Sequence, residues 1–127
     1  MTQLSKRPVD KDVYYSIRDD FLWVLQSIRN PQDVKAFYYD FFTKTERVMF
    51  AKRLAVAMML HKQFNYEDIV YILHVSTSTI NRVSEWLDKG GESTKKLLQK
   101  RMYSEEMEDF WKKVVKTLAY NLRRYHK

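Results

Sequence analysis

The side chains best suited to reading another molecule are four consecutive hydroxyls, an amide and a guanidinium. They are Ser76, Thr77, Ser78, Thr79, Asn81 and Arg82. Asparagine pairs bidentately with adenine, arginine binds guanine or a phosphate, and hydroxyls bond to bases or to the backbone. Capping a helix would use one of the hydroxyls but does not require four. We therefore expect these side chains to contact duplex DNA.

The apolar residues around this stretch fit two short helices joined by a tight turn. Ile69 and Leu73 share one face of a first helix, and Val75 follows it. Ile80 and Val83 share one face of a second helix. This spacing over residues 66–83 predicts a helix-turn-helix, a motif that places the start of its second helix in the DNA major groove.

The start of the first of these helices carries mixed charges. Lys62 and Tyr66 are the residues there that we expect to contact the DNA backbone. Glu67 and Asp68 would repel phosphate, so their expected role is to stabilise the helix start after the capping residue Asn65.

Composition favours an all-α protein of one domain's length. The chain has 127 residues, 45% of them hydrophobic, and only two Gly and two Pro, which leaves few residues for the tight turns of a sheet protein. It has no cysteine, which excludes disulfides and thiolate zinc sites. No apolar run is long enough to span a membrane, and the first residues do not resemble a secretory signal, so we expect a cytoplasmic protein.

The positive charge lies mainly in the second half of the chain. The net charge is +7, and residues 76–127 contribute +5 of it, from 12 Lys and Arg against seven Asp and Glu. A basic surface suits a phosphate-binding protein. A solvated basic surface without a partner is the alternative.

Capping signals and apolar spacing predict the other helices. We expect helices from residue 10 or 12 to 29, from 31 to 42 and from 44 to 63, with Asn30 capping the second and a Thr43–Glu46 capping box at the start of the third. A short helix over residues 93–101 and a last amphipathic helix capped by Ser104 complete the prediction. The expected organisation is a flexible arm over residues 1–10, a helix-turn-helix domain over 11–101, and a C-terminal helix with a basic tail over 102–127.

The first two predicted helices are too apolar for a solvated surface. Tyr14, Phe21, Trp23 and their apolar neighbours cover more than one helix face, which indicates burial on several sides. An intertwined homodimer would supply that burial. A compact monomer wrapped by the C-terminal helix is the alternative.

Residues 21–101 resemble the tryptophan-repressor superfamily, and especially its YerC/YecD-type branch. Three segments of the chain support the resemblance: residues 43–47 opening a long helix that reaches Arg53, residues 66–73, and the Ser76–Arg82 run with its Thr79-Ile80 pair. The resemblance implies an all-helical intertwined homodimer whose two reading heads enter successive major grooves of a near-palindromic operator. The segment from Met102 onward has no counterpart and adds a C-terminal helix.

The resemblance also implies a possible ligand pocket. The two arginines that sandwich an indole in tryptophan-binding members match Arg53 and Arg82, and Thr43 and Thr79 match as well. The family's glycine and serine are replaced here by Val83 and Trp86. We expect these larger side chains to fill the slot, so that L-tryptophan does not act as corepressor and Arg53 instead pairs with a neighbouring helix. A tryptophan- or indole-responsive repressor is the alternative.

No set of residues indicates an enzyme, a cofactor or a metal site. The histidines at 61, 74 and 126 are scattered, and the only glycines are Gly90 and Gly91, so there is no phosphate-binding glycine loop. The rival from another class is a protein-interaction adaptor that does not bind DNA, in which residues 110–122 form the contact surface. We interpret the basic end, residues 123–127, as a solvated tail rather than a phosphate-binding segment.

Overall fold

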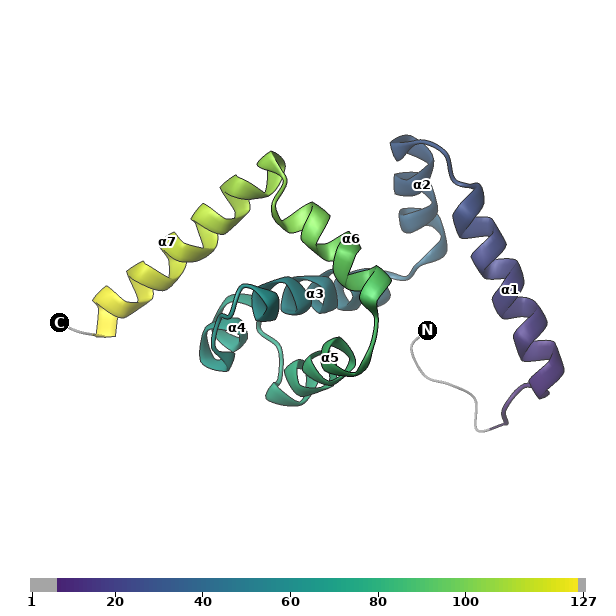
Figure 1. Cartoon of the computed structure of the whole chain (residues 1–127), viewed down its shortest axis with the longest axis horizontal. Coiled ribbons are helices and arrows are strands. Elements are labelled where there is room, and N and C mark those ends of the chain that lie inside the picture. The colour runs from purple at the N-terminus through teal and green to yellow at the C-terminus, as the bar shows by residue number, and fades with distance from the viewer. Residues whose placement is uncertain (1–6, 126–127) are drawn as a thin grey trace. The chain divides into compact units, whose positions relative to one another are not determined.

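The computed structural model describes residues 7–125, and every regular element in that range is helical (Figure 1). The all-α prediction is confirmed. The elements are α1 (Lys11–Ser27), α2 (Pro31–Phe41), α3 (Lys44–His61), α4 (Tyr66–Leu73), α5 (Thr77–Lys89), α6 (Glu92–Met102), the 3-10 helix η1 (Glu105–Met107) and α7 (Glu108–Tyr125).

Side chains cap the N-terminal ends of α2, α3 and α4, as the sequence predicts. The Glu46 N–H donates to Thr43 Oγ1 at 3.1 Å, and the Thr43 N–H donates back to Glu46 Oε1 at 2.9 Å, which completes a capping box. The backbone donation from Thr43 holds the pKa of Glu46 below its ordinary value of 4.5. Asn30 and Asn65 each accept the N–H three residues ahead, at 2.9 and 2.8 Å.

The chain divides into two compact units, residues 1–50 and 51–127. In the first unit, aromatic rings of α1, α2 and the start of α3 pack together. Phe37 stacks on Phe41 with centroids 5.0 Å apart, Phe42 meets Phe50 edge-on at 5.0 Å, and Phe21 lies within 6.5 Å of Phe42. These rings therefore give the first unit a cluster that joins its helices.

That aromatic cluster does not produce an interior. No residue of α1 or α2 is buried. Many large apolar side chains of the described part of this unit are exposed: Val9, Val13, Tyr14, Tyr15, Ile17, Leu22, Trp23, Val24, Leu25, Val34, Tyr39, Phe41, Val48, Met49 and Phe50. Trp23, for example, is 63% exposed. The first unit thus leaves uncovered the apolar faces that the sequence predicts to be buried.

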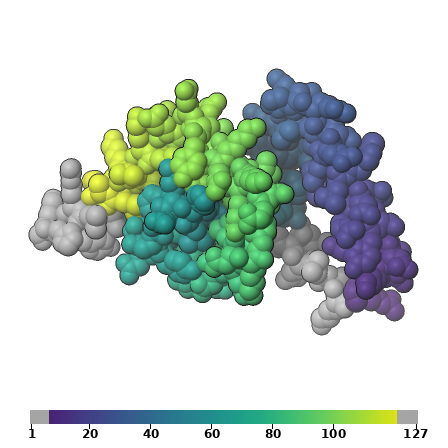
Figure 2. All heavy atoms as spheres, in the orientation of Figure 1, coloured from purple at the N-terminus to yellow at the C-terminus, as the bar shows by residue number. Residues whose placement is uncertain are grey.

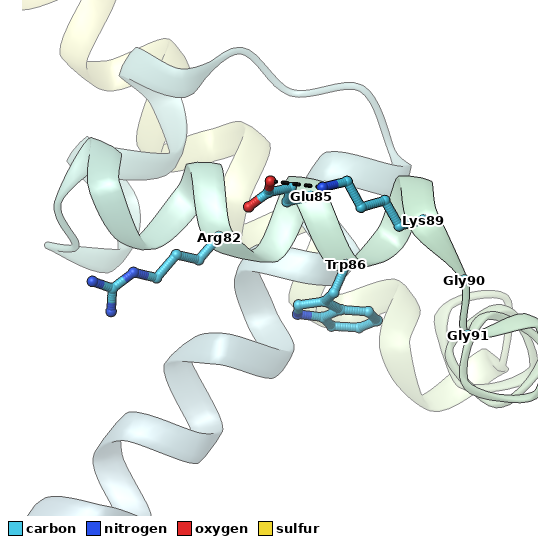
Figure 3. A pocket seen from close by; sticks show the side chains of 6 residues that line it. All are labelled: Arg82, Glu85, Trp86, Lys89, Gly90 and Gly91. Carbon is cyan, nitrogen blue, oxygen red and sulfur yellow. Dashed lines mark hydrogen bonds and ion pairs between the residues drawn. The ribbon is translucent and has the colours of Figure 1, made fainter.

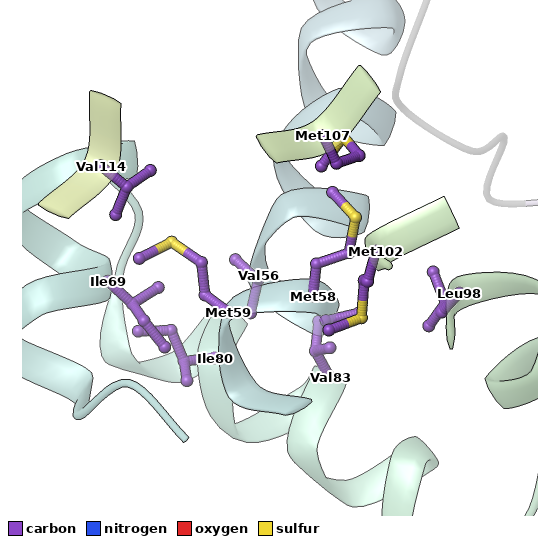
Figure 4. Packing of buried hydrophobic residues seen from close by; sticks show 11 residues of the cluster. Val56, Met58, Met59, Ile69, Ile80, Val83, Leu98, Met102, Met107 and Val114 are labelled. Atoms are coloured by element: carbon purple, nitrogen blue, oxygen red, sulfur yellow. The ribbon is translucent and has the colours of Figure 1, made fainter. Parts of the chain in front are cut away.

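The buried core lies in the second unit (Figure 4). It consists of Val56, Ala57, Met58, Met59, Ile69, Ile80, Val83, Leu98, Met102, Met107 and Val114. Every helix of the unit contributes, with α3 giving four consecutive residues. On the face shown in Figure 2, the atoms of α4 to α7 form one continuous packed surface. The second unit therefore has an interior of its own.

Helix α7 turns its apolar face to this core. Val114 is 4% exposed, and Phe110, Trp111 and Leu118 pack against the buried cluster. The Trp111 Nε1–H donates to the Met102 carbonyl at 3.2 Å. The adaptor hypothesis requires the apolar side chains of this helix on the surface. Most of them are instead packed inside the second unit.

The prediction that Ser104 caps the last helix is wrong. Ser104 precedes a 3-10 turn, and α7 begins only at Glu108. The Ser104 hydroxyl does not cap this turn; it donates to the Arg101 carbonyl at 2.6 Å. A serine followed by acidic residues suits a 3-10 start as well as an α-helix start, so the sequence pattern did not separate the two.

The two chain ends are described only in part. Residues 1–6 of the expected N-terminal arm lie outside the described residues, and Asp10 caps α1 by accepting the Asp12 N–H at 3.0 Å. The side chains of the basic end, residues 123–127, also lie outside the described part of the chain. Within the described residues, no helix combines the length and the hydropathy needed to cross a membrane.

Candidate nucleic-acid interface

Helices α4 and α5 form the predicted helix-turn-helix. Ile69 and Ile80 are completely buried and Val83 is 2% exposed, so the apolar faces of both helices point into the core as expected. Helix α4 packs against α5. The opposite face of α5 is therefore left to solvent.

The turn between these helices has a left-handed residue, His74, with φ +52°. The His74 N–H closes α4 on the Val70 carbonyl at 2.8 Å. The His74 carbonyl accepts a hydrogen bond from Lys52 Nζ at 3.2 Å. Because Lys52 belongs to α3, this bond ties the turn to the central helix of the unit.

The polar run at the start of α5 divides into two kinds of side chain. Ser76 is the N-cap, because its Oγ accepts the Thr79 N–H at 3.1 Å and lies 3.1 Å from the Thr79 hydroxyl. Thr77 and Ser78 are exposed in the first turn of α5. Capping thus engages two of the four hydroxyls rather than one.

Asn81 and Arg82 are exposed on the next turn of the same helix. Together with Thr77 and Ser78 they place two hydroxyls, an amide and a guanidinium on the solvent face of α5, with Ile80 buried on the other. These groups donate and accept hydrogen bonds in the combinations that base edges and phosphates require. We call this set the reading face of α5.

Tyr66 and Lys62 have different surroundings. Tyr66 is exposed at the first position of α4. The Lys62 ammonium lies over two rings, 4.8 Å from the centroid of Tyr103 and 5.0 Å from that of Trp111. Sequence reasoning missed this cluster, since its members come from three separate segments and no local pattern joins them. A phosphate contact by Lys62 would have to compete with the rings.

The residues of the possible ligand pocket have different surroundings. Val83 is buried in the core, Thr79 bonds to Ser76, and Arg53 is exposed on α3. Thr43, in the first unit, is occupied by its capping box with Glu46.

Arg82 and Trp86 are the two members of that set that line an open groove along α5. The groove has a volume of about 530 Å³, and its other lining residues are Glu85, Lys89, Gly90 and Gly91 (Figure 3). Lys89 is paired with Glu85 at 3.0 Å. Figure 3 shows the Arg82 side chain pointing away from the Trp86 ring, so the two side chains do not face one another across the groove.

A family model described as Trp repressor protein matches residues 18–102. That range contains α2 to α6 and most of α1, and it stops before η1 and α7. Neither a curated protein nor a solved structure gives a significant match to the chain. The match covers about two thirds of the sequence, including the whole helix-turn-helix and its reading face. The chain therefore belongs to the Trp repressor family, a family of helix-turn-helix DNA-binding regulators.

Proposed function

We propose that this protein is a sequence-specific transcriptional regulator, acting as a repressor, that reads duplex DNA with α5. The observation behind the proposal is the reading face: Thr77, Ser78, Asn81 and Arg82 are exposed on a helix whose other side is anchored in the core. An exposed polar face on the second helix of a helix-turn-helix is what major-groove recognition requires.

The expected contacts follow from the chemistry of each group. Asn81 is suited to pair bidentately with adenine, and Arg82 to guanine or to a phosphate. The hydroxyls of Thr77 and Ser78 suit bases or phosphate oxygens, and Tyr66 at the start of α4 suits the backbone. Ser76 and Thr79 contribute through the cap that fixes the first turn of α5.

We further propose that the protein binds as a homodimer, with a second copy covering the first unit. A stable interface buries about 1,200–2,000 Å² in total and is apolar at its centre. The exposed apolar side chains of α1 and α2, Leu22 and Trp23 among them, offer such a centre. Two reading faces related by a two-fold axis would recognise two half-sites about one helical turn apart, which makes the operator near-palindromic.

Selection of duplexes from a random pool, followed by titration of the selected site, tests DNA reading. Asn81→Ala should cost about 1–3 kcal/mol and relax preference at one base pair, whereas Arg82→Ala should weaken binding broadly if the guanidinium holds phosphate. Gln99→Ala, which removes an exposed amide from α6, is the matched control and should change neither. The proposal is contradicted if the folded protein selects no sequence. It is also contradicted if Asn81→Ala and Arg82→Ala bind DNA with the same affinity as the control Gln99→Ala.

Sedimentation at micromolar concentration tests the dimer. The single chain has a mass of 15.5 kDa, and a stable species of that mass would refute the proposal. Leu22→Glu puts a charge among the apolar residues of α1 and should shift the equilibrium towards single chains. Leu97→Glu makes the same change at an exposed leucine of α6 and should leave the mass of the sedimenting species unchanged.

A further inference from the structure

The C-terminal segment completes the core beneath the helix-turn-helix, although it lies beyond the part of the chain that matches the family. Met107 and Val114 are 8% and 4% exposed, in the same buried cluster as Ile69 and Ile80. Helix α4 packs against α7 as well as α5. The orientation of α4 therefore depends on residues at the far end of the chain.

The junction between α3 and α4 is where this dependence is concentrated. Gln63 has φ +66°, a left-handed conformation that a residue with a Cβ rarely adopts. The Gln63 N–H donates to the Leu60 carbonyl at 2.9 Å and the Phe64 N–H donates to the Met59 carbonyl at 3.0 Å, which is the Schellman arrangement that ends a helix. The direction in which the chain enters α4 is set by these few residues.

Two side chains flanking Gln63 are held by α7 and the turn before it. Phe64 lies parallel to Trp111, with ring centroids 6.1 Å apart. Lys62 places its ammonium over Tyr103 at 4.8 Å and over Trp111 at 5.0 Å. Both distances are within the range of about 6 Å over which a cation is attracted to a ring face. The indole is fixed in turn by its hydrogen bond to the Met102 carbonyl at 3.2 Å.

We propose that Lys62, Tyr103 and Trp111 form a clamp that positions the helix-turn-helix for DNA binding, and that Lys62 acts on DNA through this clamp rather than by holding a phosphate. Helix α4 has eight residues, too few to be stable alone, so its position depends on its neighbours. Loosening the clamp lowers the fraction of molecules whose reading face is oriented for the major groove. The apparent affinity for DNA falls in proportion to that fraction. The clamp proposal rests on the proposed DNA-binding function.

The variant that separates the two roles of Lys62 is Tyr103→Leu. It removes one ring of the clamp and leaves every charge in place. Tyr103 is 66% exposed, so the change does not open the core. Tyr120→Leu is the matched control, because Tyr120 on α7 is also 66% exposed and lies outside the clamp. If Lys62 positions α4, Tyr103→Leu should weaken operator binding about two- to fivefold, the fold-change expected for losing an exposed cation–π contact.

The salt dependence of binding provides the second readout. Each lysine that holds a phosphate contributes about 0.9 to the slope of log K against log salt concentration. Lys62→Ala removes the ammonium from both rings, so it should lower affinity at least as much as Tyr103→Leu while keeping the wild-type slope. Lys62→Arg should restore affinity because a guanidinium also stacks on rings. The double variant Lys62→Ala with Tyr103→Leu should be no weaker than Lys62→Ala alone, since Lys62→Ala already removes the contact with Tyr103.

Three results would overturn the clamp. One is a slope that falls by about one unit in Lys62→Ala, which would assign the lysine to a phosphate. Another is Tyr103→Leu binding as tightly as Tyr120→Leu. The third is amide hydrogen exchange of residues 66–73 at the same rate in both tyrosine variants. The clamp predicts exchange about two- to fivefold faster in Tyr103→Leu, and this readout needs no DNA. Wild-type protein that binds no duplex would instead reject the proposed function, and the exchange experiment would still decide the clamp.

Discussion

Replacing Ser76 by alanine should lower the stability of the protein. The Ser76 hydroxyl accepts the Thr79 N–H at 3.1 Å and meets the Thr79 hydroxyl at 3.1 Å, so the substitution leaves an N-terminal amide of α5 without its partner. Loss of such a cap costs about 0.5–2 kcal/mol. Unfolding entropies of about 2.1 cal/mol/K per residue give a chain of 127 residues about 0.27 kcal/mol/K, so a loss of about 1 kcal/mol lowers Tm by about 4 °C.

The neighbouring Ser78→Ala provides the contrast. Ser78 is exposed inside the first turn of α5, where alanine is the better helix former, so Tm should stay the same or rise slightly. Thermal melts at one fixed chain concentration measure both variants, since the stability of an oligomer varies with concentration. Operator binding well below Tm should then weaken in Ser78→Ala if that hydroxyl contacts DNA. Equal Tm values for wild type and Ser76→Ala would refute the assignment of Ser76 to the cap.

Three further outcomes are expected. The lowered pKa of Glu46 means that this carboxylate stabilises the fold at pH values above its ordinary 4.5 and loses that contribution as the pH falls through the lowered pKa; urea midpoints should therefore drop less between pH 6 and pH 3 in Glu46→Gln than in wild type. Calorimetry with millimolar L-tryptophan should show no saturable heat, because Trp86, which packs against the core, stands where the family resemblance implies a small serine, and displacing a packed group costs on the order of 1–3 kcal/mol; tight binding that raises operator affinity would restore the corepressor hypothesis. His74→Gly should raise stability by up to about 1 kcal/mol in denaturant titrations, because glycine adopts the positive φ of +52° without a Cβ clash; a destabilised variant would contradict this.

The sequence predicts best those features that depend on residues a few positions apart. Asn30, Asn65 and Ser76 each cap the helix expected to start there, because the cap and the N–H it accepts are neighbours in the chain. The helix-turn-helix was equally predictable, because the burial of Ile69 and Ile80 follows from the spacing of apolar residues within one motif.

Features that depend on residues far apart in the sequence could not be predicted in this way. The partners of Lys62 are rings from the segment after α6 and from α7, and only the packing of the second unit brings them together. The left-handed conformations of Gln63 and His74 also escaped prediction, because no glycine marks either position.

The missing interior of the first unit has a consequence for how such a regulator responds to its own abundance. If a second copy supplies the cover for Leu22, Trp23 and their neighbours, the paired species grows with the square of the free chain concentration. Below the dissociation constant of the pair, halving the amount of protein cuts the paired form about fourfold. Operator occupancy then falls more steeply than the protein concentration. The rate at which the protein is synthesised therefore controls occupancy without any small-molecule effector.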